Sequence, residues 1–230
     1  MELNRKVILR DGAYLLVIEG ILIWILGQPM FTLPMAIILI LSYIVYACHV
    51  IYDSKKSNEP KEEYDGIIQS GKIAWAYVIG SVASLTFFCH YLAKGIDSIA
   101  TIANWPVYMI AVTLGAAATS LPDTILSIKS AKAGQGDDSV ANAIGSNIFD
   151  ISGATALPVL FVMIYMLFNG QEAVLPLEQS AGLIGLRYFV WGTSALVVGI
   201  LTAFAKKIDN KVAYFFFSIY GAWIAYLAMS

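Results

Sequence analysis

The chain has 230 residues, of which 59% are hydrophobic and only 13% are charged, and its formal net charge is −2. Soluble domains carry about 45–50% apolar and about 25% charged residues, and one core of this size cannot bury such an apolar surplus. With a mean hydropathy of +0.73, the composition excludes a soluble globular protein. The near-neutral charge offers no basic surface to nucleic acid, and we expect no nucleic-acid partner.

Seven apolar segments are long enough to cross a bilayer, for which a helix needs about 20 residues. In chain order they cover about residues 8–27, 30–52, 73–94, 106–131, 139–168, 182–205 and 212–229. The sequence therefore predicts an all-α integral membrane protein with about seven transmembrane helices that contact the lipid bilayer. The predicted organisation is two helices in residues 1–52, a charged cytoplasmic linker at 53–72 and a five-helix unit at 73–230.

Lysine and arginine residues collect in loops on the cytoplasmic side of membrane proteins. A seven-helix arrangement with a cytoplasmic N-terminus puts 12 of the 14 basic residues on that side. These are Arg5, Lys6, Arg10, Lys55, Lys56, Lys61, Lys72, Lys129, Lys132, Lys206, Lys207 and Lys211. The distribution predicts a multi-pass protein whose N-terminus is cytoplasmic and whose C-terminus lies on the opposite side.

Three acidic residues lie well inside the predicted spans: Glu19, Asp123 and Asp150. A carboxylate in hydrocarbon costs about 2.5–3.5 kcal/mol or more, so each one is a candidate functional residue. For Glu19 a structural explanation is equally open, since it could pair with Arg10 or extend toward the interface. The two cysteines, Cys48 and Cys89, fall in apolar stretches and are expected to be small buried side chains.

Helix-breaking residues accompany both aspartates. Pro122 precedes Asp123 and should kink or break its helix near residue 118. The segment around Asp150 is 30 residues long, about 45 Å as a continuous helix, against a hydrocarbon core of about 30 Å. It also contains Gly153 and Pro158. We therefore expect two of the seven helices to be broken.

The spacing of polar residues around these breaks suggests one cation site. Thr119 precedes Asp123 by four residues and Ser146 precedes Asp150 by four, so each pair shares a helix face. Carboxylate, hydroxyl, amide and carbonyl oxygens are the ligands of hard cations, and interrupted helices supply them in transporters. The predicted cation-binding residues are Thr119, Ser120, Asp123, Asn142, Ser146 and Asp150, with Asp123 and Asp150 as metal ligands. Hydroxyls that bond only to their own helix are the structural alternative.

Two strings carry a family resemblance. They are Thr119-Ser120-Leu121-Pro122-Asp123 and Gly145-Ser146-Asn147-Ile148-Phe149-Asp150-Ile151. Residues 113–160 resemble the second α-repeat of the calcium/cation antiporter superfamily, especially that of the potassium-dependent sodium/calcium exchangers. Arg10-Asp11-Gly12 and the tyrosine-rich residues 43–52 resemble the fourth and fifth helices of the ten-helix family fold.

The resemblance implies a component of a cation antiporter that exchanges calcium for sodium by alternating access. It implies transported ions rather than a cofactor, and no enzymatic activity. Thr119, Ser120, Asp123, Ser146 and Asp150 match family positions that bind calcium or sodium. In the potassium-dependent branch, the position of Asp150 is associated with potassium co-transport.

The family carries two inverted α-repeats, whereas this sequence contains one such element. We therefore expect a second chain that carries the first repeat. A homodimer is the other arrangement, but an inverted one conflicts with the single orientation that the basic residues indicate. A non-transporting partner subunit or an incomplete remnant remains an alternative function.

An enzymatic alternative comes from Gly134-Gln135-Gly136-Asp137, which matches the GxGD string of intramembrane aspartyl proteases. Those enzymes need two aspartates inside membrane helices, sharing a proton. Asp137 is predicted to lie in a polar cytoplasmic loop beside Lys132 and Asp138, where a glycine-rich turn is the simpler interpretation.

Overall fold

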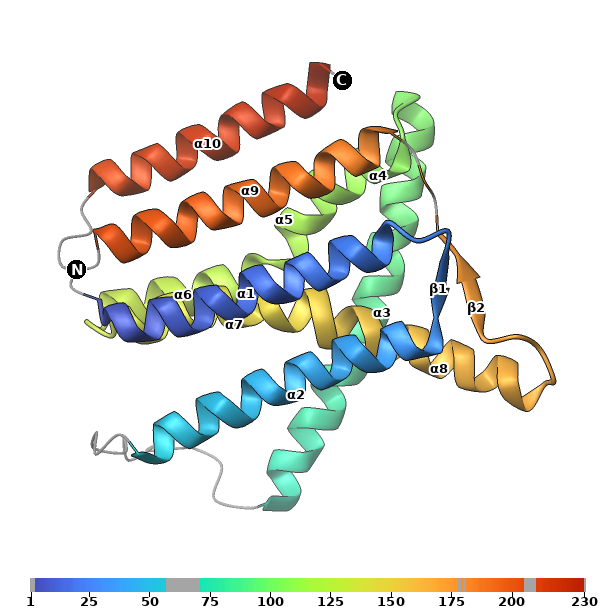
Figure 1. The fold of residues 1–230 in the computed structure, drawn as a ribbon, viewed down its shortest axis with the longest axis horizontal. Coiled ribbons are helices and arrows are strands. Elements are labelled where there is room, and N and C mark those ends of the chain that lie inside the picture. Colours follow the sequence, from blue (N-terminus) through green and yellow to red (C-terminus); the bar gives the residue numbers. More distant parts are fainter. Residues whose placement is uncertain (1–2, 57–70, 178, 180, 205–209, 230) are drawn as a thin grey trace. The chain divides into compact units, whose positions relative to one another are not determined.

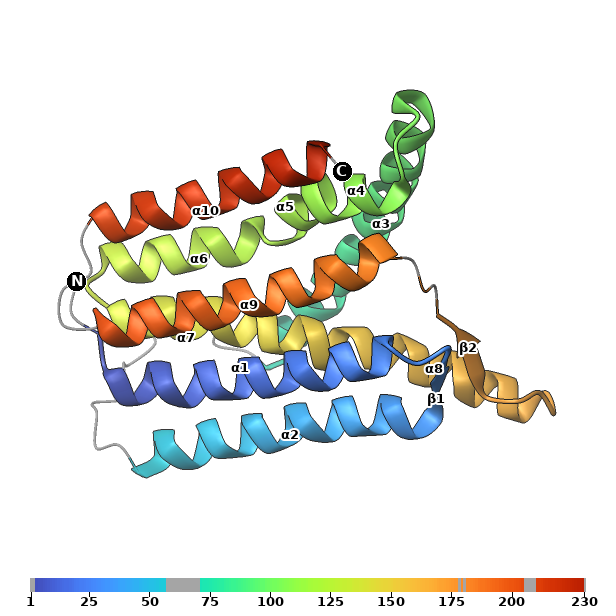
Figure 2. The ribbon, with the colours of Figure 1, turned by 45° about the horizontal axis from the view of Figure 1, so that its top comes forward.

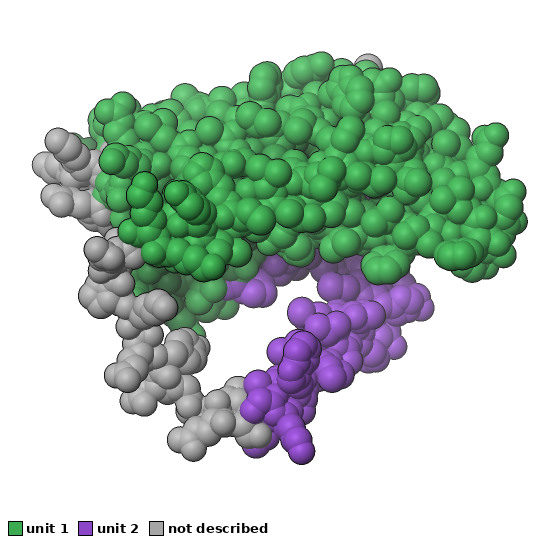
Figure 3. All heavy atoms as spheres, turned by 60° about the horizontal axis from the view of Figure 1, so that its bottom comes forward, with its two compact units in different colours: residues 1–57, 123–219 green, residues 58–122, 220–230 purple. Residues whose placement is uncertain are grey.

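The structure is a computed structural model that describes residues 3–56, 71–177, 179, 181–204 and 210–229 (Figure 1). The chain divides into two compact units, which are considered separately. The first comprises residues 1–57 and 123–219, and the second comprises residues 58–122 and 220–230 (Figure 3). The division predicted from sequence, at 52 and 72, stays a prediction. Residues 57–70 of the predicted linker lie outside the described residues.

Helices make up nearly all of the first unit. Its elements are α1 (Arg5–Leu26), β1 (Met30–Thr32), α2 (Leu33–Lys56), most of α6 (Leu121–Lys132), α7 (Gly136–Phe149), the π-helical segment η2 (Asp150–Ala154), α8 (Thr155–Phe168), β2 (Val174–Pro176), α9 (Ala181–Ala203) and the first half of α10 (Asn210–Met229). Helix α1 lies between α2 and α9 and also packs against α7 (Figure 2).

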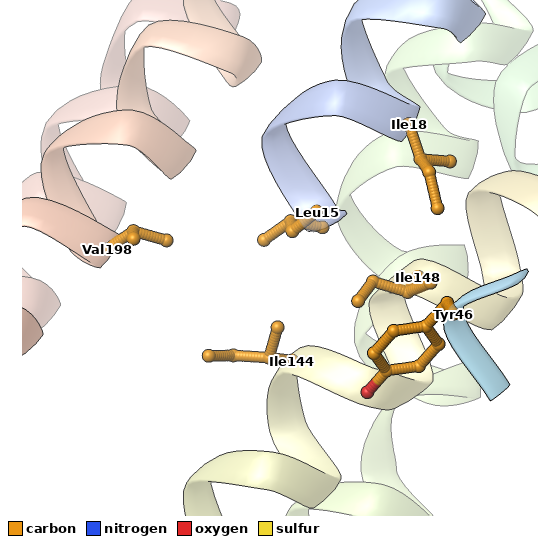
Figure 4. Close-up of a cluster of buried hydrophobic side chains, with 6 residues drawn as sticks. All are labelled: Leu15, Ile18, Tyr46, Ile144, Ile148 and Val198. Carbon is orange, nitrogen blue, oxygen red and sulfur yellow. The ribbon is translucent and has the colours of Figure 1, made fainter. Parts of the chain in front are cut away.

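One buried cluster joins the helices around α1. Its members are Leu15, Ile18, Tyr46, Ile144, Ile148 and Val198, which come from α1, α2, α7 and α9 (Figure 4). Gly12 lets α1 approach α9 closely, because a Cβ at this position would overlap Cγ1 of Val198. The Arg10-Asp11-Gly12 string thus lies where α1 meets its neighbours.

A short two-stranded sheet lies at the C-terminal end of α1 and the N-terminal end of α2. Strands β1 and β2 pair antiparallel, with Phe31 opposite Leu175 at the centre. Phe31 is buried with Ile25 of α1 and with Met163 of α8. The pairing connects the α1–α2 turn to the α8–α9 connection, and no sequence pattern predicted it.

Arg10 bridges α1 and α2. Its Nε lies 2.7 Å from Oδ1 of the fully buried Asp11, and its Nη1 lies 2.9 Å from Oδ2 of Asp53. His49 extends this network, with Nε2 3.6 Å from Asp53 Oδ2. Arg10 is therefore engaged by two aspartates, and the ion pair with Glu19 that the sequence allowed is not formed.

The second unit contains α3 (Gly71–Ala103), α4 (Val107–Ile110), the π-helical segment η1 (Ala111–Gly115), α5 (Ala116–Thr119) and the end of α10. Both α4 and η1 pack against α3. Gly115 permits this approach, because a Cβ there would lie 2.8 Å from Cδ1 of Ile96.

Four stretches among the described residues are long and apolar enough to cross a membrane: Leu33–Lys56, Gly71–Ala103, Gly136–Phe168 and Ile184–Ala203. They carry exposed large apolar side chains such as Trp75, Phe88 and Phe161, as expected where lipid replaces water. The total of seven spans and the orientation of the termini stay predictions. Cys48 and Cys89 are exposed on such stretches, so the expectation that they are buried was wrong.

Candidate cation site

The helix that carries Asp123 is interrupted at Ser120, two residues before the proline. Helix α5 ends at Thr119, Ser120 forms a turn, and α6 begins at Leu121. Pro122 falls in the first turn of α6, where its missing N–H breaks no helical hydrogen bond. The predicted break near residue 118 is thus found at Ser120, and it puts Asp123 in the first turn of a helix.

The helix that carries Asp150 is disturbed in a different way. Helix α7 continues through the π-helical segment η2 into α8, so residues 136–168 form one uninterrupted helical stretch. Pro158 has no N–H to bond the carbonyl of Ala154, one turn earlier. The π-helical segment ends at Ala154. Thr155 Oγ1 donates to the Asp150 carbonyl oxygen at 2.7 Å. Such π-helical turns occur most often at functional sites.

Both aspartates belong to the first unit, on helices that are joined by a hydrogen bond from Asn142 of α7 to α6. Asp123 is half-buried and Asp150 is exposed. Neither takes part in an ion pair within the described part of the chain. Two neighbouring negative charges without a basic partner favour the binding of a cation.

Asn142 joins the helices that carry these aspartates. Its Nδ2 donates to the backbone oxygen of Asp123 at 3.2 Å and to Oγ of Ser127 at 3.0 Å. This leaves the amide oxygen of Asn142 as the atom that can bind a cation. Ser127 is a residue that the sequence analysis missed, although its spacing of four from Asp123 on α6 could have indicated it.

Two further predicted residues, Ser146 and Thr119, donate their hydroxyl hydrogens within their own segments. Ser146 is half-buried and donates to the carbonyl oxygen of Ala143 at 3.3 Å. Thr119 donates to the carbonyl oxygens of Gly115 and Ala116 at 3.2 and 3.1 Å. A hydroxyl that donates to its own helix still offers lone pairs to a cation. Thr119 and Ser120 belong to the second unit, and the other four predicted residues belong to the first.

The described residues contain no group of three or more histidine, cysteine, aspartate or glutamate side chains that could hold a metal ion. Two carboxylates with one amide oxygen and one hydroxyl oxygen supply four oxygens if each carboxylate binds through one oxygen and six if both bind through two, against the six to eight that calcium takes. The residues of the first unit thus fit part of a hard-cation site.

Asp137, from the protease-like string, lies elsewhere. It belongs to the first turn of α7 and not to a loop as predicted, and its Oδ1 accepts a hydrogen bond from the backbone N–H of Asn4 at 2.6 Å. Gly134 has a φ of +85°, as a glycine-rich turn before a helix requires.

Apolar helices that are disturbed midway and carry aspartates at the disturbances define a class of protein, the membrane ion transporters. The chain belongs to the sodium/calcium exchanger protein family, which matches residues 73–229. Members of this family are transporters and not enzymes, which excludes the aspartyl protease. The predicted resemblance to the potassium-dependent exchangers is confirmed.

Several individual relatives are sodium/potassium/calcium exchangers. The chain is 26% identical over 147 residues to Nckx30C of Drosophila melanogaster and 28% identical over 151 residues to exchanger 2 of Gallus gallus. These alignments cover 64% and 66% of this chain but only 16% and 22% of the relatives. Exchanger 1 of Bos taurus is 32% identical over 96 residues, which is 42% of this chain and 8% of that protein. No solved structure matches the chain.

Proposed function

We propose that the chain is a component of a cation antiporter that exchanges calcium for sodium by alternating access. Asp123 and Asp150 are its shared carboxylate ligands. The observation that carries the proposal is that Asn142 of α7 donates a hydrogen bond to the backbone oxygen of Asp123 and so joins the helices that carry the two aspartates, neither of which forms an ion pair in the described part of the chain. The names of the relatives, which include sodium, potassium and calcium, support the choice of ions.

Exchange follows from the charge of the site. When it is empty, two negative charges lie close together in a segment that should be surrounded by hydrocarbon, which is costly. One calcium ion or two monovalent cations neutralise them equally, so the two kinds of ion compete for the same oxygens. The conformational change is then favoured only with cations bound, and this couples calcium movement to sodium movement.

The helix disturbances give the site a means of opening to either side. The turn at Ser120 and the π-helical segment Asp150–Ala154 are places where a few backbone angles can change. Such positions act as hinges in many conformational transitions. Thr119, Ser120, Asn142 and Ser146 supply further oxygens in this proposal, with the hydroxyls favouring sodium. Potassium co-transport would act through Asp150.

The remaining ligands come, in our proposal, from a second chain that carries the complementary α-repeat. The support is that the sequence holds one such element, and that the four predicted ligands of the first unit reach the lower limit of six oxygens for calcium only if both carboxylates bind through both oxygens. A cytoplasmic N-terminus and a C-terminus on the other side belong to the same proposal.

The test is calcium transport in lipid vesicles that contain the full chain, with and without a protein carrying the first α-repeat. We expect uptake of radioactive calcium driven by a sodium gradient only when both proteins are present. Asp123→Asn and Asp150→Asn should each abolish it, whereas Asp138→Asn, at an exposed aspartate of α7, should leave it intact. Uptake by the chain alone would show that a homodimer or a single copy is sufficient.

Equilibrium binding separates transport from a non-transporting role. Calcium binding that depends on Asp123 and Asp150, without transport in any pairing, would identify a partner subunit or a remnant. Binding that is unaffected by both substitutions would contradict the site itself.

A further inference from the structure

Helices α1 and α9 bury a carboxyl group that the proposed exchange does not use. The side chain belongs to Glu19, whose exposed fraction is 9%. Ser194 Oγ donates a hydrogen bond to Glu19 Oε1 at 2.7 Å. The other oxygen, Oε2, is buried and has no hydrogen-bond partner in the part of the chain that the structure describes. This is a buried polar atom without a structural explanation.

The position of Glu19 is fixed by the packing of α1 on α9. Gly12 faces Val198, and Trp191 Nε1 donates to the carbonyl oxygen of Leu16 at 3.0 Å. Farther along, Arg187 donates to the carbonyl oxygen of Leu26. The two helices therefore run antiparallel, and the contacts of Gly12 and Leu26 with α9 lie on either side of the pair Glu19–Ser194.

Among the described residues, no positive charge forms an ion pair with this carboxyl group. Arg187 bonds at Leu26, seven residues from Glu19, which is about 10 Å along a helix. Arg10 is engaged by Asp11 and Asp53. The other titratable groups on the elements packed against α1 are Tyr43, Tyr46, Cys48, His49, Tyr52, Lys55 and Lys56 of α2, Asp137 and Asp138 of α7, Asp150 of η2, and Tyr188 of α9. Within the described residues none of them forms a hydrogen bond or ion pair with Glu19.

Three states of this carboxyl group can be compared. An ionised carboxylate with one hydroxyl partner leaves a charge without compensation in an apolar interior, which is the least favourable state. A metal cation would need several oxygens, at least six for calcium, whereas the pair offers two carboxylate oxygens and one hydroxyl. A proton needs a single oxygen, and a buried O–H without an acceptor costs less than a buried charge.

We propose that Glu19 and Ser194 form a proton-binding site between α1 and α9. The proton resides on Oε2, and Oε1 accepts the hydrogen bond from Ser194. The site is separate from Asp123 and Asp150 and does not depend on the proposed exchange. Loss of the proton puts a charge between the two helices, so their contact responds to pH.

The direct test is infrared spectroscopy of the full chain in lipid nanodiscs, from about pH 5 to about pH 9. A protonated carboxyl group has a C=O stretching band that an ionised one lacks. Asp123→Asn/Asp150→Asn serves as the background, so that those carboxyl groups do not contribute. We expect a band at neutral pH that is lost in Glu19→Gln, retained in Glu172→Gln, an exposed matched control, and moved to higher frequency in Ser194→Ala.

An unchanged band in Glu19→Gln, or no such band at neutral pH, would overturn the proposal. Loss of the band on addition of sodium or calcium in the same background would show that a metal cation is the ligand, and would overturn it as well. If Glu19→Gln does not fold, the unsubstituted chain can be treated with a lipid-soluble carbodiimide, which modifies protonated carboxyl groups. We expect modification of Glu19 that decreases as the pH rises, and its absence at every pH would contradict the proposal. None of these measurements requires transport, so this proposal and the proposed function can fail independently.

Discussion

The link between α6 and α7 gives a prediction that can be worked out from the structure. Asn142→Ala removes two hydrogen bonds, the one to the backbone oxygen of Asp123 and the one to Ser127 Oγ. Each bond contributes about 0.5–1.5 kcal/mol, so the loss is about 1–3 kcal/mol. If the link positions Asp123 for a cation, its loss alone should lower calcium affinity by roughly 5-fold to 150-fold, since about 1.4 kcal/mol corresponds to tenfold, and loss of the Asn142 amide oxygen as a ligand adds to this fall.

The assay is equilibrium binding of calcium to the full chain together with the first-repeat protein. Asn147→Ala is the matched control, because its Nδ2 donates to the Ala143 carbonyl oxygen within the same helix and makes no link to α6. We expect calcium affinity within about twofold of the unsubstituted chain for this control, since a bond within an exposed helix face contributes little. The double variant Asn142→Ala/Ser127→Ala should be less than additive, because the two residues share a bond. Equal losses of calcium affinity in Asn142→Ala and Asn147→Ala would contradict a role of the Asn142 link in positioning Asp123.

Two further predictions concern the packing around α1. Gly12→Ala should lower the free energy of unfolding by about 1–3 kcal/mol, because its Cβ overlaps Val198. Gly20→Ala is the control, because its added Cβ meets nothing within 4 Å beyond its own helix backbone and chain neighbours, and it should raise the free energy of unfolding by up to about 1 kcal/mol. Thermal unfolding in detergent measures the effect of each substitution. Changes of the same sign in the two variants would contradict the close packing of Gly12 on Val198. Asp11→Asn should destabilise by about 3–5 kcal/mol, because it leaves a part-buried arginine without its buried partner. Asp53→Asn should lower the free energy of unfolding much less in the same measurement. A larger loss in Asp53→Asn than in Asp11→Asn would contradict the conclusion that Asp11 is the main partner of Arg10.

Local sequence patterns predicted the helix break beside Asp123 better than the contacts between helices. Pro122 predicted the break that lies at Ser120, and the spacing of four residues drew attention to the two aspartates. Both patterns can be recognised in the sequence because the effect of a proline and the pairing of side chains four residues apart act within one or two helical turns. The π-helical form of residues 150–154 could not be distinguished from a break, since proline and glycine disturb a helix in either way. Asp137 was expected in a loop because it is polar, although acidic residues also suit the first turn of a helix.

The features that sequence reasoning missed are long-range. Ser194 is 175 positions from Glu19, and β1 pairs with a strand more than a hundred residues away. Such partners are set by how the helices pack, and no periodicity within one segment carries that information. The pairing of Arg10 with Asp53 was missed for the same reason, since Asp53 lies at the far end of the next helix.

The central claim is that Asp123 and Asp150 hold the exchanged cation, and one measurement tests it most directly. The chain is reconstituted in vesicles with the first-repeat protein, and sodium-gradient-driven calcium uptake is compared among Asp123→Asn, Asp150→Asn and Asp138→Asn. The account predicts that uptake is lost in the first two variants and preserved in the third. Uptake that persists in Asp123→Asn and Asp150→Asn would contradict it.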